Sequence, residues 1–97
     1  MSYHSQVVRV ATVGSDVDID TVAIKIHGVT VMPDGTNLAT VIISNGASAT
    51  ATNHRWEGRT PGTQSLDVNF PAPYIVNDPV IKITGTGAIV YVRTEPV

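Results

Sequence analysis

Histidine is the side chain best suited to acid–base chemistry at neutral pH, and the sequence contains three. His4, His27 and His54 are far apart in the chain, and none belongs to a nucleophile or zinc motif such as G-x-S-x-G or H-E-x-x-H. We interpret them as surface residues. No catalytic residue and no cofactor is predicted, and we do not expect the chain to be an enzyme.

Three alternating acids could bind a cation. Asp16, Asp18 and Asp20 resemble the start of a calcium loop, but Thr21 occupies the position of its glycine and the later bidentate glutamate is missing. We therefore predict no metal site, and interpret Gly14–Asp20 as a solvated loop. The glutamates likewise show no spacing that favours a carboxylate pair for glycoside hydrolysis.

A glycine-rich run near the C-terminal end resembles a fragment of a phosphate-binding loop. No helix follows Gly85-Thr86-Gly87 to direct amide groups at an anion, so turn geometry explains the glycines better. Val80–Thr84 and Ala88–Arg93 on either side are rich in β-branched residues. The pattern predicts that these two strands form a tight hairpin.

The composition predicts an all-β protein in a single domain spanning residues 1–97, with residues 1–5 as an extended arm. Valine, isoleucine and threonine dominate, whereas leucine, lysine and glutamate are scarce. Charged residues make up 14% of the chain, against roughly 25% in an ordinary globular domain. A surface with so little charge favours association, and we expect a homo-oligomer, most simply a trimer.

The charge and hydropathy patterns exclude several partners. A net charge of −2 without a basic stripe argues against nucleic-acid binding. No run of 18 apolar residues and no signal peptide is present, so we expect a soluble protein without a membrane partner. The chain has no cysteine, which removes disulfides and thiol chemistry.

Alternating hydrophobic residues and turn signals locate the strands. Gln6–Thr12 is the first candidate, and Thr21–Val31 alternates cleanly until Gly28, where we expect a bulge or bend. A turn at Pro33-Asp34-Gly35 then precedes a strand at Leu38–Ser44. Asn45-Gly46 predicts a type I′ hairpin that leads into an antiparallel strand within residues 47–59.

Later prolines mark further boundaries. Pro61-Gly62 ends one strand, and the alternation of Leu66–Phe70 predicts the next. We expect Pro71 and Pro73 to stop it in a longer crossing, because proline cannot donate to a β-ladder, and to leave one short strand at Tyr74–Val76. The fold predicted is an antiparallel β-sandwich, jelly-roll or Greek-key-like, with seven to eight short strands. Its predicted core comprises Val22, Ile24, Ile26, Leu66, Val68, Phe70, Ile81 and Ile83.

Trp56 is the residue with the composition of an interface anchor. It is the single tryptophan, and Arg55, Glu57 and Arg59 surround it. The alternative is that this tryptophan fills the core of a small β domain. We name Arg55, Trp56 and Arg59 as the candidate protein interface.

The stretch from about residue 40 to residue 92 contains five runs in a characteristic order: Val41–Gly46 (VIISNG), Arg55–Gly58 (RWEG), Leu66–Pro73 (LDVNFPAP), Ile81–Ala88 (IKITGTGA) and Val90–Val92 (VYV). This order resembles small β-sandwich virion proteins of tailed bacteriophages. The resemblance implies a capsid decoration or cement protein that bridges neighbouring capsid subunits, or a neck or tail component.

The same resemblance implies a symmetric oligomer, a major capsid or other virion protein as partner, and a location in the virion after assembly from the host cytoplasm. From the residues alone, the alternative is a carbohydrate-binding, lectin-like sandwich in which Trp56 and a tyrosine stack on sugar rings. Sugar binding would need the indole exposed beside Asn or Asp side chains, whereas assembly would place it under a neighbouring chain.

Overall fold

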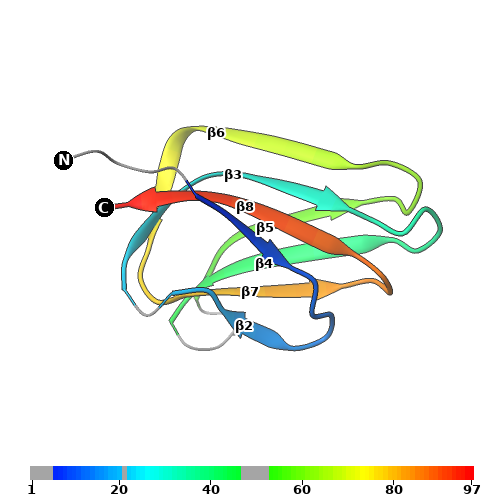
Figure 1. Cartoon of the computed structure of the whole chain (residues 1–97), viewed down its shortest axis with the longest axis horizontal. Helices are drawn as coiled ribbons and strands as arrows, with labels where there is room; N and C mark the ends of the chain where they lie inside the picture. Colours follow the sequence, from blue (N-terminus) through cyan, green and yellow to red (C-terminus); the bar gives the residue numbers. More distant parts are fainter. Residues whose placement is uncertain (1–5, 21, 47–52) are drawn as a thin grey trace.

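The computed structural model describes residues 6–20, 22–46 and 53–97, so His4, Thr21 and the expected arm at residues 1–5 lie outside the described residues. All its regular structure is β-strand (Figure 1). The strands are β1 (Gln6–Val10), β2 (Asp16–Asp18), β3 (Ile24–Met32), β4 (Ala39–Asn45), β5 (His54–Thr60), β6 (Leu66–Val76), β7 (Pro79–Thr84) and β8 (Ile89–Pro96).

The strands form two four-stranded antiparallel sheets that face each other as a sandwich. One sheet has the order β1-β8-β3-β6 and the other β2-β7-β4-β5. Of the consecutive strands, only β4 and β5 are neighbours in one sheet, and every other connection crosses between the sheets. This is the strand order of a jelly roll, and the predicted fold class is confirmed.

The predicted hairpin at the C-terminal end is wrong. β7 and β8 lie in opposite sheets, so the turn between them carries the chain across the sandwich. Gly85 and Gly87 have φ angles of 113° and 76°, which only glycine adopts easily. The buried side chains of β7 and β8 therefore meet face to face in the core, as Ile81, Ile83, Val90 and Val92 do.

The strand after Asn45-Gly46 is antiparallel to β4, as predicted, but the tight two-residue turn is wrong. β5 starts only at His54, and the Asn45 N–H donates to the Asn53 carbonyl at 2.9 Å. Gly46 has φ 101°, and its N–H donates instead to Asn77 at 2.9 Å. The glycine thus joins β4 to the β6–β7 turn rather than closing a hairpin.

The bulge expected at Gly28 is confirmed. β3 pairs with both β6 and β8, and each register shifts between Ile26 and Gly28. One extra residue reverses the alternation, so Ile24 and Ile26 face inward before the bulge and Val29 and Val31 after it. The bulge therefore lets a nine-residue strand keep its apolar side on the core.

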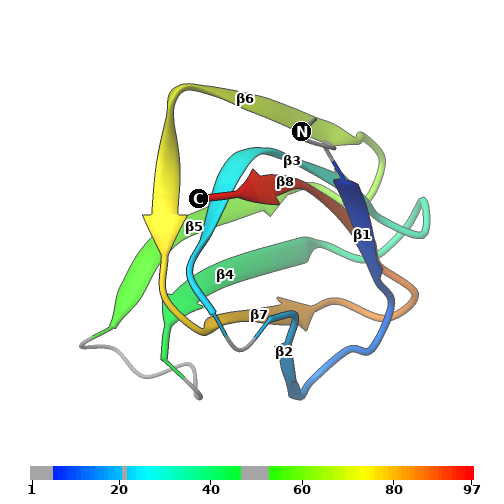
Figure 2. The same ribbon diagram turned by 60° about the vertical axis from the view of Figure 1, so that its left-hand side comes forward.

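The prediction that Pro71 and Pro73 end a strand is wrong. β6 runs through both prolines to Val76. Figure 2 shows that this strand bends sharply before it reaches its end. Its pairing with β3 is interrupted between Asn69 and Tyr74, so neither proline has to donate to the ladder. The expected strand at Tyr74–Val76 is the end of β6, and the chain crosses between the sheets later, before Pro79.

The predicted loop at Gly14–Asp20 contains a short strand. β2 pairs with β7 through main-chain groups, with Val17 opposite Ile81, while the carboxylates of Asp16 and Asp18 remain exposed. Three residues with acids on both sides of a valine give too weak a pattern to indicate a strand.

The core lies between the two sheets. Ile24, Ile26, Ile81 and Ile83 are buried as predicted, Leu66 and Phe70 are half-buried against the core, and Val68 is half-buried. Val22 is a wrong prediction: 61% of it is exposed, because β3 begins only at Ile24. The remaining buried cluster consists mainly of residues that the predicted core lacked: Val10, Val29, Val31, Ala39, Val41, Ile43, Val76, Ala88, Val90 and Val92.

Candidate protein interface

The residues named from the sequence as an interface lie on one strand but on opposite faces of it. Along β5 the side chains alternate, so Arg55 and Arg59 are exposed on the outer face, and Trp56 is half-buried on the inner face. The structure therefore does not bring Trp56 together with the two arginines. Any partner that contacts both arginines meets the outer face of the β2-β7-β4-β5 sheet.

Trp56 belongs to an aromatic cluster between the two sheets. Its ring centroid lies 5.4 Å from that of Phe70 in an edge-to-face arrangement, and Phe70 contacts Tyr74 in the same way at 4.8 Å. The indole also lies over Gly58, where an added Cβ would come within 2.4 Å of Trp56 Cη2. The cluster joins edge strand β5 to edge strand β6. No pattern in the sequence predicts that these three rings meet.

A polar network covers the outer face of the other sheet. Arg93 donates hydrogen bonds to Thr30 Oγ1 at 2.8 Å, to the Val68 carbonyl at 2.9 Å and to Asn69 Oδ1 at 3.0 Å. It also forms an ion pair with Asp67 at 3.1 Å. The Thr30 hydroxyl donates to Asp67 at 2.8 Å, and this bond, with Arg93, holds the pKa of Asp67 below its usual value.

A second set of charges lies beside this network on β3 and β8. Glu95 Oε1 is 2.8 Å from His27 Nε2 and 4.0 Å from Lys25 Nζ. The distance from His27 Nε2 is short, but the two groups are not aligned for a hydrogen bond. Glu95 therefore faces Lys25, and Arg93 faces Asp67, so these four charges are already matched on the outer face.

One end of the sandwich is formed by the connections 11–15, 33–38, 61–65 and 85–88. We call it the uncharged end, because Asp34 is the sole ionisable side chain in these four connections. Its carboxylate is used internally: it accepts hydrogen bonds from the N–H groups of Thr36 and Asn37 at 2.9 and 2.8 Å, which lower the pKa of Asp34. Leu38 is 51% exposed at this end, and Met32, at the end of β3, is 43% exposed.

The opposite end of the sandwich is acidic. Asp78, in the turn before β7, shares a hydrogen bond with Asp18, and this bond and the charges of Asp18 and Asp20 raise the pKa of Asp78. Asp78 also has a φ of 46°. Within the described ranges, no group of three or more His, Cys, Asp or Glu is arranged to hold a metal ion. The calcium-like spacing of Asp16, Asp18 and Asp20 therefore corresponds to no candidate site among these residues.

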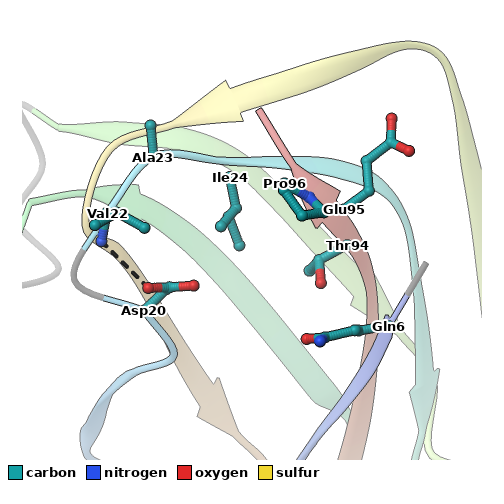
Figure 3. Close-up of a pocket in the computed structure, with 8 residues that line it drawn as sticks. All are labelled: Gln6, Asp20, Val22, Ala23, Ile24, Thr94, Glu95 and Pro96. Carbon is teal, nitrogen blue, oxygen red and sulfur yellow. Dashed lines mark hydrogen bonds between the residues drawn. The ribbon is translucent and has the colours of Figure 1, made fainter. Parts of the chain in front are cut away.

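A small depression opens at the same end (Figure 3). It has a volume of about 240 Å³ and lies between β1, the end of β8 and the start of β3. Gln6, Asp20 and Thr94 point toward its space, whereas Glu95 points away. Asp20 already accepts a hydrogen bond from the Val22 N–H at 3.2 Å. This lining selects no particular ligand.

No family model matches the chain, and neither the curated proteins nor the solved structures contain a match. None of the described residues form a helix that could span a membrane. The jelly roll itself occurs in proteins of unrelated function, including viral capsid and lectin domains. The candidate function therefore depends on the surfaces of this molecule.

Proposed function

We propose that this chain is a non-enzymatic structural protein of a bacteriophage virion, most simply a capsid decoration or cement protein that bridges neighbouring capsid subunits. A neck or tail component would use the same kind of surface. Its partners are a major capsid or other virion protein and further copies of itself. In this proposal it is present in the host cytoplasm before assembly and in the virion afterwards.

The uncharged end is the observation that favours attachment to a protein. Four connections with a single, internally satisfied carboxylate surround the exposed side chains of Leu38 and Met32. Apolar side chains form the buried centre of protein interfaces, where charged residues are depleted. Jelly-roll ends also vary freely in sequence without disturbing the sheets, so such a surface can be adapted to a particular partner.

This proposal predicts attachment that resists salt. Few charges contribute to the uncharged end, so screening removes little of the binding free energy. The test is to purify virions from cells that produce the chain, wash them in high salt, and measure its stoichiometry by mass spectrometry. We expect the chain to remain bound in stoichiometric amounts.

A matched pair of variants locates the attachment. Leu38 and Ile75 are both 51% exposed, but Ile75 lies near the end of β6, away from the uncharged end. Leu38→Lys should lower occupancy on washed virions by about tenfold or more, because the ammonium group would lose its hydration in the contact. Ile75→Lys should leave occupancy unchanged. Equal loss in both variants, or absence of the parent chain from particles, would contradict the proposal.

The lectin-like alternative has its own result. Saturable binding on a glycan array that Trp56→Ala abolishes would replace the assembly proposal. Trp56→Phe is the control, because it keeps an aromatic ring next to Phe70 and so separates sugar stacking from damage to the aromatic cluster.

A further inference from the structure

The four edge strands of the two sheets differ in how well they are protected. An edge strand presents unpaired main-chain groups to other chains, and proteins block such edges with prolines, charges, bulges or short strands. β6 contains Pro71 and Pro73 and an interrupted register, and β2 has three residues with two aspartates. β5 carries His54, Arg55, Glu57 and Arg59 on seven residues.

β1 has none of these protections except one charge. Its five residues, Gln6–Val10, include three valines, no proline and the single charge of Arg9, and its pairing with β8 is regular. Val7 faces outward and is 63% exposed. It lies opposite Arg93, but the guanidinium of Arg93 is directed away from it, toward Thr30, Asp67 and Asn69. The polar network therefore leaves Val7 uncovered.

We propose that β1 pairs with β1 of a second copy, antiparallel about a twofold axis, and joins two four-stranded sheets into one of eight strands. The partner must also offer an edge strand, and in another copy of this chain β1 is the least protected edge among the described strands. Contact between identical edges is isologous and closes as a dimer. A trimer built through β1 would instead require β1 to pair with one of the protected edges of the next copy.

The sequence of β1 suits pairing with itself in one register. The twofold axis must pass through Val7, Val8 or Arg9. Only then do opposite residues of the two β1 strands point to the same side, so that the core-facing sides of the two sheets stay on one side of the joined sheet. An axis at Arg9 would place two arginines opposite each other, which is destabilising. An axis at Val8 uses all five residues and places Val7 opposite Arg9 of the second copy, where the aliphatic part of arginine covers the valine.

Analytical ultracentrifugation over a range of concentrations measures the association. The contact is small, so we expect a monomer–dimer equilibrium at high protein concentration rather than a permanent dimer. Val7→Lys should weaken dimerisation by about tenfold, because each of two symmetric pairs becomes Lys opposite Arg. Ile75→Lys, on the far edge of the same sheet, and Leu38→Lys, at the uncharged end, should dimerise like the parent.

Cross-linking tests the register. The chain contains no cysteine, so Val7→Cys introduces a unique thiol. In the pairing about Val8 the two Val7 positions are diagonal neighbours, about 7–8 Å apart. A short bis-maleimide should therefore give a covalent dimer with Val7→Cys and none with Ile75→Cys. Circular dichroism confirms that each variant is folded.

Each contrary result is distinct. A monomer at millimolar concentration would overturn the proposal, and so would a trimer whose stability Val7→Lys leaves unchanged. A trimer weakened by Val7→Lys, without the Val7→Cys cross-link, would contradict the twofold pairing and show β1 paired with another edge strand of the next copy. Virion occupancy is measured separately, so failure of the dimer leaves the virion proposal unaffected.

Discussion

The guanidinium group of Arg93 lies over the main chain of Gly28, in the space where any other residue would have its Cβ. A Cβ added at Gly28 would be 2.3 Å from Arg93 Nη2 and 2.5 Å from the Val68 carbonyl oxygen. The bulge in β3 and the polar network on the outer face therefore both require that residue 28 has no side chain. Gly28 provides both the bend of the strand and the room for Arg93.

Gly28→Ala should destabilise the protein by about 1–3 kcal/mol, the usual cost of overpacking. Denaturant unfolding of the variant measures this loss. Arg93 is flexible and can move away, whereas the Val68 carbonyl belongs to the main chain of β6. Gly28→Ala should therefore cost less in an Arg93→Ala background than in the parent, but still destabilise. If it costs nothing in that background, the guanidinium alone requires glycine here.

Asp78→Asn should make the protein more stable at neutral pH. Asp18 and Asp20 raise the pKa of Asp78 in the folded state, so its contribution to stability is complete below the unfolded pKa, about 3.9, and is lost as the pH rises through the folded pKa. Asparagine removes the charge and tolerates the φ of 46°. The gain over the parent should shrink on acidification, and an equal gain at pH 3 and pH 7 would contradict this origin.

Asp67→Asn provides the opposite control. The hydrogen bond from Thr30 and the charge of Arg93 lower the pKa of Asp67 in the folded state. Its contribution is therefore present above the unfolded pKa and lost as the pH falls through the lower folded pKa. Asp67→Asn should destabilise at neutral pH and approach the parent in acid. Thermal melting of both variants from pH 2 to 7 compares the two signs directly.

Phe70→Ala should destabilise the protein by about 3 kcal/mol, the low end of the range for phenylalanine, because the ring is half-buried yet contacts both Trp56 and Tyr74. Phe70→Leu keeps much of the volume and should cost less. Because Trp56 is the single tryptophan, its fluorescence reports this cluster. A Phe70→Ala variant that unfolds like the parent would show that the cluster adds nothing to stability.

The sequence revealed features that depend on neighbouring residues and missed those that depend on the partner strand. The alternation of β3 and the bulge at Gly28 were visible because period and glycine act locally. Gly85 and Gly87 indicate a turn whether the next strand pairs in the same sheet or crosses to the other one. The sequence therefore did not determine which sheet β8 joins. Pro71 and Pro73 misled because their effect depends on whether the strand is paired there.

The candidate surfaces follow the same division. The four connections of the uncharged end, with Asp34 as their single ionisable residue, can be read directly from the sequence once the strands are known. The network of Arg93 with Thr30 and Asp67 joins residues from three strands, and no local pattern connects them. Trp56 was singled out by its type, but its place on the inner face of β5 depends on the register with β4.

The crossing connections also determine how the chain can fold. β8 is the last strand of the sequence, yet it lies between β1 and β3 and pairs with both. On the ribosome, β1 and β3 must remain without this partner until residues 89–96 have left the exit tunnel. Folding dominated by such distant pairings is slow, on the order of milliseconds to seconds. Until β8 emerges, the nascent chain therefore exposes two strands rich in valine and isoleucine, and during this time aggregation competes with folding.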